Sequence, residues 1–198
     1  MQVVLLTEGS DLDSLSSAYA LSLIEKNTYI YIPHSYSESF KIALQTFKEK
    51  LKPKIIKKEH LKEVKKFFVV DTSSLLKINQ IISEANLNQN IKITIIDHHE
   101  KVQKLPDHLK KIEVNYGACT TYFVKKIKRK KIPLDELDAT LISLGIYEDT
   151  GCLKYSNTTY HDVDALSFLI KQGINFEIIN NILTERFNKK TIKIIEDA

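Results

Sequence analysis

The chain has 198 residues, which suits one medium-sized domain with a substantial buried core. Its hydrophobic fraction of 43% and charged fraction of 27% are ordinary for a soluble globular protein, and no stretch approaches the ~20 apolar residues of a membrane span. The net charge of +4 permits a phosphate or nucleic-acid ligand without requiring one. The two cysteines, Cys119 and Cys152, are too few for a disulfide framework and do not form a CxxC pair, so we expect a reducing cytoplasm.

The first half of the chain alternates apolar strands with helices. We expect strands at residues 3–6, 29–33, 54–57, 67–70 and 91–96, and helices at residues 13–26, 36–51 and 72–85. Residues 58–66 predict an exposed charged helix or loop, and residues 86–90 a polar turn. This alternation predicts an α/β fold: a doubly wound, mostly parallel sheet with helices on both faces.

The second half of the chain is mostly helical. After a loop with a helical turn to residue 111, we expect a strand at residues 112–116 and helices at residues 117–128, 134–147, 162–172 and 176–183. Residues 1–175 are expected to form one domain, and residues 176–198 a helical C-terminal segment. The helix-like pattern through Phe187, Ile192 and Ile195 stops without a cap, which predicts a fragment of a longer protein; a natural C-terminal helix that frays is the alternative.

Four short segments carry ionisable side chains where a strand or helix is expected to end. They contribute Asp11 with Asp13, Asp71, Asp97 with His98 and His99, and Asp149 just past a predicted helix. Three of the segments follow parallel strands, whose carboxyl ends share one edge of a sheet. Because carboxylates crowd together only when cations neutralise them, convergence would create a divalent-metal site. Taken singly, each has a simpler interpretation as a helix cap or a surface histidine.

The order and spacing of these segments resemble the DHH phosphoesterases, which include family II pyrophosphatases, single-strand exonucleases and oligoribonucleotidases. The sequences at residues 117–121 and 145–151, followed by Thr158-Thr159 and residues 162–165, narrow the resemblance. They are similar to DHH domains fused to CBS modules and a tRNA nucleotidyltransferase or poly(A) polymerase. The similarity covers residues 1–175, so CBS and nucleotidyltransferase modules would follow in a longer chain.

The resemblance implies a site with two cations, in which Asp71 bridges both. Asp11 would bind the first cation, and Asp13, His98 and Asp149 would complete the second. A mixed set of carboxylate and imidazole ligands favours Mn²⁺ over Mg²⁺, because imidazole is a poor ligand for Mg²⁺.

The same resemblance assigns catalytic roles to two neighbouring residues. His99 would bind the substrate phosphate as a hydrogen-bond donor or general acid, and Asp97 would orient the imidazoles.

The sequence departs from the family pattern in two places. The family has a histidine where this chain has Thr7, and a hydroxyl is a much poorer metal ligand. Glu8 could reach a metal, although neighbouring strand residues point to opposite faces. The second departure is the absence, after residue 175, of the substrate domain that usually closes over the metals. Thr7 therefore predicts a weakened enzyme, a changed metal preference or a domain retained for binding.

Two functions remain open. The first is a metal-dependent phosphoesterase that hydrolyses phosphodiester or phosphoanhydride bonds of RNA 3′ ends, short oligonucleotides or small phosphoanhydrides. The second is a non-catalytic or regulatory DHH domain of a tRNA-processing fusion. Either function implies a phosphate-containing or RNA partner and no membrane, and a homodimer is left open.

The run Lys125–Lys131 is the most basic stretch of the chain and could attract RNA. The favoured interpretation is a solvated helix end, where cations complement the helix dipole. The run itself contains no interleaved aromatic residue on which bases could stack.

Residues at the end of the 145–151 segment have predicted structural roles. Gly151 is expected to adopt a backbone geometry that a Cβ atom would obstruct. The neighbouring Cys152 is expected to be a small buried residue and not a nucleophile.

Overall fold

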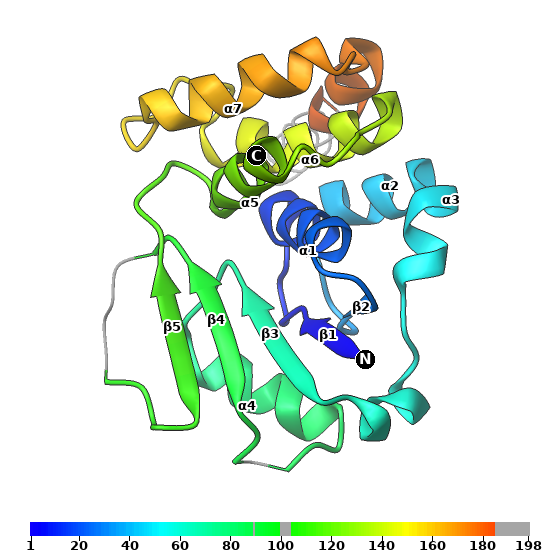
Figure 1. The fold of residues 1–198 in the computed structure, drawn as a ribbon, viewed down its shortest axis with the longest axis vertical. Coiled ribbons are helices and arrows are strands. Elements are labelled where there is room, and N and C mark those ends of the chain that lie inside the picture. Colours follow the sequence, from blue (N-terminus) through cyan, green and yellow to red (C-terminus); the bar gives the residue numbers. More distant parts are fainter. Residues whose placement is uncertain (89, 100–103, 185–198) are drawn as a thin grey trace, which may run out of the picture.

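A parallel sheet organises the fold of the computed structural model, which describes residues 1–88, 90–99 and 104–184 (Figure 1). Its five strands have the order β2-β1-β3-β4-β5, and all four neighbouring pairs are parallel. The strands are β1 (Gln2–Leu5), β2 (Thr28–Tyr31), β3 (Lys66–Val70), β4 (Ile93–Asp97) and β5 (Leu109–Glu113). From β1 the sheet extends to one side with β2 and to the other with β3, β4 and β5. Open parallel sheets bind ligands at the carboxyl ends of the strands where this change of side occurs, here between β1 and β3.

Helices cover both faces of this sheet, as predicted (Figure 1). The core on one face is shared by α1 (Leu12–Ile24), α2 (Glu38–Thr46), α5 (Cys119–Lys130), α6 (Glu136–Asp149) and α7 (Tyr160–Lys171), of which α6 and α7 pack on other helices. The other face packs against α4 (Leu75–Glu84). Side chains alternate between the two cores, since Val4 belongs to the first and Val3 to the second.

Helices α1 and α6 lie in the interior and are buried on nearly every side. Small polar residues let them approach closely: the Ser16 hydroxyl donates to the carbonyl oxygen of Leu141 at 2.7 Å, and the Gly145 N–H donates to Ser16 Oγ at 3.2 Å. A Cβ atom at Gly145 would lie 2.6 Å from Thr120 Oγ1 and 3.0 Å from Asp13 Cα. This packing places Asp13, near the start of α1, beside the end of α6.

Several predicted elements differ from the structure. Residues 54–57 are not a strand: Lys52–Lys54 form a 3₁₀ helix, and Ile55 makes only an isolated bridge with Ile30. The helix expected at residues 36–51 divides into α2 and α3 (Lys48–Leu51), and residues 58–63 form a 3₁₀ helix. Strand β5 begins three residues before its predicted start, and α6 extends to Asp149.

Residues 176–184 are helical, and their side chains Ile179 and Ile182 are buried in the core that contains α1. The division into domains at residue 175 stays a prediction. The apolar pattern predicted after residue 185 lies outside the described residues. Within the described ranges, no helix has the length and apolar character needed to cross a membrane.

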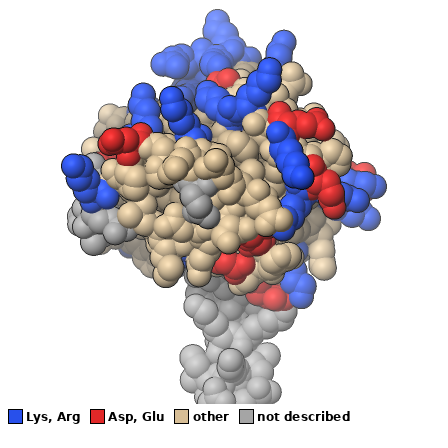
Figure 2. All heavy atoms as spheres, turned by 90° about the horizontal axis from the view of Figure 1, so that it is seen from below, with Lys and Arg blue, Asp and Glu red and all other residues tan. Residues whose placement is uncertain are grey.

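The surface shown in Figure 2 is the side on which the strands begin. Lysine and arginine side chains project along the upper edge and both sides of this face, acidic side chains lie among them and towards the lower edge, and the centre is mostly uncharged.

Candidate metal centre

Four of the five predicted metal ligands meet at the carboxyl edge of the sheet. Asp13 comes from α1, Asp71 follows β3, His98 follows β4, and Asp149 ends α6. One potential ligand atom from each lies within 4.8 Å of all the others. His99 forms an overlapping group with Asp71 and His98. The strand order explains the meeting, because β3 and β4 are neighbours and α1 follows the adjacent β1.

Asp71 has a left-handed backbone conformation. Its φ of 59° lies in a region that is uncommon for residues other than glycine and that aspartate adopts more readily than most. The Asp71 N–H donates to the carbonyl oxygen of Ile96 at 2.9 Å, and the Ser14 hydroxyl donates to Asp71 Oδ2 at 2.7 Å. Asp71 Oδ1 is buried, and no group in the described chain makes a hydrogen bond with it.

His98 presents its Nε2 atom to the carboxylates. Its Nδ1 lies 3.1 Å from the carbonyl oxygen of Tyr116, which can only accept, so Nδ1 carries the proton in this contact. Nε2 lies 3.1 Å from Asp149 Oδ2, 3.3 Å from Asp71 Oδ1 and 4.0 Å from Asp13 Oδ2. Like Asp71 Oδ1, this buried nitrogen makes no well-aligned hydrogen bond among the described residues. A histidine with one nitrogen fixed by a carbonyl and the other facing carboxylates has the usual arrangement of a metal ligand.

The electrostatics of the cluster favour a bound cation. Burial raises the pKa of Asp13 well above its usual range, and repulsion from Asp149 and Asp71 adds to the effect. Burial, with repulsion from Asp71 and Glu148, raises the pKa of Asp11 to about 8. Burial opposes protonation of His98, but the close approach of the Asp149 and Asp71 carboxylates outweighs it and raises the His98 pKa to about 11. These carboxyl groups therefore hold protons in the absence of another positive charge.

Asp97 is fully buried, and of the two imidazoles it contacts only that of His99. Asp97 Oδ1 lies 2.8 Å from His99 Nδ1, while Asp97 Oδ2 lies 3.0 Å from the Lys111 ammonium. Burial alone would raise the pKa of Asp97, but hydrogen bonds from His99, Ser73 and Lys111 lower it below its usual range. The His99 side chain is 60% exposed, so its remaining nitrogen is available to a ligand. Of the two imidazoles that Asp97 is predicted to orient, the structure places only His99 in contact with it, and His98 instead contacts the carbonyl oxygen of Tyr116.

Sequence reasoning missed three side chains that support this site. Ser14 donates to Asp71, and Lys111 pairs with Asp97. Glu148 accepts from the N–H of Leu12 at 2.6 Å and from the Ser39 hydroxyl at 3.0 Å. The interruption of the apolar pattern of β5 by Lys110 and Lys111 was the one available signal for Lys111. The contact of Ser14 depends on tertiary packing, and local sequence carries no signal for it.

The remaining predicted residues lie around the cluster. Asp11 caps α1 by accepting from the Ser14 N–H at 3.1 Å, and it belongs to neither group of converging ligands. Glu8 belongs to neither group, and Thr7 is buried, with its carbonyl oxygen accepting from Ser10.

Gly151 adopts φ +54°, and a Cβ atom there would lie 2.5 Å from the Tyr155 ring. The prediction for Cys152 was wrong in one respect, because this thiol is exposed.

The donor set suits a divalent cation that accepts oxygen and nitrogen ligands. Three carboxylates and one imidazole can reach a common point, and two of their buried ligand atoms lack hydrogen-bond partners within the described ranges. Mg²⁺ prefers oxygen ligands alone, and Mn²⁺ accepts imidazole beside them. The residues present therefore fit Mn²⁺ better than Mg²⁺.

Comparisons with known families identify this arrangement. The model of the DHH family N-terminal domain matches residues 2–146, which is most of the chain. The chain therefore belongs to the DHH family. Its fold also resembles two solved structures: an exopolyphosphatase-related protein from Bacteroides fragilis, with a TM-score of 0.66 and 17% identity, and a "putative family II inorganic pyrophosphatase" of Methanococcus jannaschii, with a TM-score of 0.68 and 21% identity. These structures match over 91% and 93% of this chain and 55% and 61% of their own chains.

Curated relatives include two A-adding tRNA nucleotidyltransferases. The protein from Aquifex aeolicus is 35% identical over 98% of this chain, and that from Geobacter sulfurreducens is 23% identical over 100% of it. The chain spans 22% of the length of each. A bifunctional oligoribonuclease and PAP phosphatase NrnA of Mycoplasma genitalium is 27% identical over 58% of this chain and 40% of its own length.

Proposed function

We propose that the chain is a divalent-metal-dependent phosphoesterase that hydrolyses phosphodiester or phosphoanhydride bonds. The observation that carries this proposal is the convergence of Asp13, Asp71, His98 and Asp149 within 4.8 Å, two of them with buried, unpaired ligand atoms among the described residues. Phosphoryl transfer needs neutralised phosphoryl oxygens and a nucleophile that is active at neutral pH, and divalent cations supply both when bound.

In this proposal the chain's own residues have separate tasks. Asp13, His98 and Asp149 would hold one cation, Asp71 would serve both cations, and Asp11 would add a ligand to the other. His99 is exposed and turned towards the cluster by Asp97, so it can donate a hydrogen bond or a proton to a substrate phosphate. Lys111 holds the Asp97 carboxylate in its charged form.

RNA 3′ ends or short oligonucleotides are the proposed substrates. The relatives include an oligoribonuclease and two enzymes that act on tRNA, which supports an RNA substrate over pyrophosphate. Because the chain spans about a fifth of the length of the tRNA nucleotidyltransferases, the presence of nucleotidyltransferase and CBS modules in a longer chain is also a proposal.

A second candidate function is a DHH domain that binds without catalysis in such a fusion. Thr7 favours it, since the site lacks the histidine that the family provides there. Metal binding without turnover would distinguish this function from the first.

The decisive experiment is a Mn²⁺ titration of hydrolysis, with an oligoribonucleotide and pyrophosphate as substrates. Asp71→Asn should abolish turnover because it removes the shared carboxylate, whereas Asp107→Asn, at an exposed loop position, should behave as wild type. Activity that survives Asp71→Asn would contradict the metal-dependent mechanism. Mn²⁺ binding by a wild-type chain that turns over neither substrate would establish the second candidate.

A further inference from the structure

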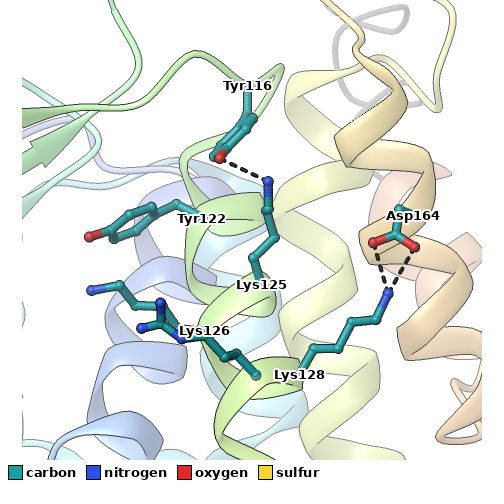
Figure 3. Close-up of a pocket in the computed structure, with 7 residues that line it drawn as sticks. Tyr116, Tyr122, Lys125, Lys126, Lys128 and Asp164 are labelled. Atoms are coloured by element: carbon teal, nitrogen blue, oxygen red, sulfur yellow. Dashed lines mark hydrogen bonds and ion pairs between the residues drawn. The ribbon is translucent and has the colours of Figure 1, made fainter.

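A pocket of about 470 Å³ lies on the exposed side of α5, and none of the four converging metal ligands lines it (Figure 3). Two tyrosines and four cations line it: Tyr116, Tyr122, Lys125, Lys126, Lys128 and Arg129. The run Lys125–Lys131 itself contains no aromatic residue, but Tyr116 and Tyr122, which precede it in the chain, lie beside it in this pocket. Tyr122 lies one helical turn before Lys126, and Tyr116 precedes the helix.

Each tyrosine is paired with a lysine. The Lys126 ammonium lies 4.4 Å from the centre of the Tyr122 ring, and the Lys125 ammonium lies 4.7 Å from the centre of the Tyr116 ring. Figure 3 shows Lys126 on the same side of α5 as Tyr122, while Lys125 points to Tyr116. Both tyrosines are only partly buried, and each ring also contacts one other ring edge-on: His161 lies 4.9 Å from the Tyr116 ring, and Phe123 lies 5.2 Å from the Tyr122 ring.

The charge of the pocket is only partly compensated. Lys128 donates to both oxygens of Asp164 at 2.9 Å, which occupies that lysine. Neither Lys126 nor Arg129 pairs with a carboxylate among the residues that the structure describes. These two cations therefore remain available to phosphates.

A second pocket of about 270 Å³ adjoins the first, and Tyr122 and Lys126 line both. The second pocket lies against the sheet, where it is lined by Phe68, Thr94 and Ile112 of three strands. It adds two more cations, Lys66 and Lys110. Its one carboxylate, Glu25, lies 3.6 Å from the Lys130 ammonium. We call the two adjoining pockets the α5 groove.

One end of the α5 groove adjoins the candidate metal centre. Tyr116 lines the groove, and its backbone carbonyl oxygen lies 3.1 Å from His98 Nδ1, so this one residue links the groove to the cluster. The groove itself contains none of the proposed metal ligands.

We propose that the α5 groove binds a single-stranded polynucleotide, independently of metal and of hydrolysis. Cations spaced along a groove track a phosphate backbone, and aromatic rings between them accept unpaired bases by stacking. A base that stacks on Tyr122 displaces Lys126 from the ring towards the adjacent phosphate. Paired bases cannot reach the rings, so the groove selects single strands over duplexes.

The test measures the binding of a fluorescently labelled single-stranded oligoribonucleotide by fluorescence anisotropy. The buffer contains EDTA, so that metal-dependent hydrolysis does not contribute. Lys126→Gln with Arg129→Gln should raise the Kd about tenfold and reduce the slope of log Kd against log salt by ~1.4, or ~0.7 for each lost phosphate contact. Lys48→Gln, an exposed lysine on α3, should leave both unchanged. An unchanged Kd and slope in the double variant would overturn the proposal.

The role of the rings is tested separately. Tyr122→Leu should weaken oligoribonucleotide binding about fivefold or more, and Tyr122→Phe, which retains the ring, should restore it. Inorganic polyphosphate of equal charge should compete poorly with the oligoribonucleotide, and so should duplex RNA. Equal competition by either, or equal binding by Tyr122→Leu and Tyr122→Phe, would refute recognition of unpaired bases. Because no metal is present, these outcomes do not depend on whether the chain is an enzyme.

Discussion

The buried Lys111–Asp97 pair shows how a single residue prepares the candidate site. Asp97 has no access to solvent, and its two oxygens are divided between His99 and Lys111. A buried carboxylate stays charged only when such partners offset its desolvation. His99 therefore has a fixed charged partner, which raises its pKa and keeps one nitrogen directed at Asp97.

Thr7 is the residue at which the chain departs from its family, and replacing it gives a direct prediction. Thr7→His should restore an imidazole ligand and lower the Mn²⁺ concentration needed for half-maximal hydrolysis by about tenfold or more, because each correct ligand adds strongly to metal affinity. The second cation site, with Asp13, Asp71, His98 and Asp149, should still fill first.

The measurement is the same Mn²⁺ titration of oligoribonucleotide hydrolysis, with Thr7→Val as the control of similar shape. Turnover that appears only in Thr7→His would identify a lapsed enzyme. Indistinguishable Mn²⁺ requirements for the histidine and valine variants would exclude Thr7 as a missing ligand position.

At the scale of helices and strands, the site depends on how closely α6 approaches α1. Gly145→Ala should destabilise the fold by about 1–3 kcal/mol, since the added methyl group overpacks this contact. In an exposed helix the same change would stabilise by ~1 kcal/mol, so the sign of the effect tests the contact. A Cβ atom would meet Thr120 Oγ1 at 2.6 Å.

The check is chemical denaturation of the wild-type and Gly145→Ala chains. Ser167→Ala, at an exposed position of α7, controls for the helix propensity of alanine. If Gly145→Ala proved more stable than wild type, α6 and α1 would not be packed as closely as described.

The elements that sequence predicted well are those whose local pattern matches their burial. Strands β1, β3 and β4 are apolar runs buried on both faces. β5 was misplaced because it is an edge strand in which Lys110 and Lys111 interrupt the apolar pattern. Residues 54–57 have strand composition, but Ile55 makes only an isolated bridge with Ile30.

The site was predictable to the extent that its residues follow strands. Asp71 and His98 come directly after β3 and β4, so their meeting follows from the order of parallel strands. Asp149 ends a helix, and its place in the cluster depends on the packing of α6 against α1. The supporting contacts of Ser14 and Glu148 join residues far apart in the chain, and no local pattern indicates them.

For the molecule as a whole, the shared charge of the cluster predicts pH-dependent metal binding. Without metal, the pKa of Asp11 is raised to about 8 and that of His98 to about 11, so both groups carry protons at neutral pH. A cation must displace these protons, and lowering the pH favours the protonated groups over the metal-bound ones. Mn²⁺ affinity should therefore rise between about pH 6 and about pH 8.

Calorimetric titration with Mn²⁺ in buffers of different ionisation enthalpy would measure both the affinity and the protons released. Asp11→Asn should release fewer protons than wild type, because it removes the carboxyl group with the pKa of about 8. An affinity that does not change with pH would show that the cluster is not the binding site.

The long sequence separation between the converging residues has a consequence for synthesis. A ribosome completes the sheet when it adds Glu113, but Asp149 follows only at the end of α6. Glu148, which accepts from the N–H of Leu12 at the start of α1, arrives at the same time. A nascent chain that has not reached this point carries Asp13, Asp71 and His98 without the fourth ligand. The complete four-ligand pocket therefore forms only after all five strands have been synthesised.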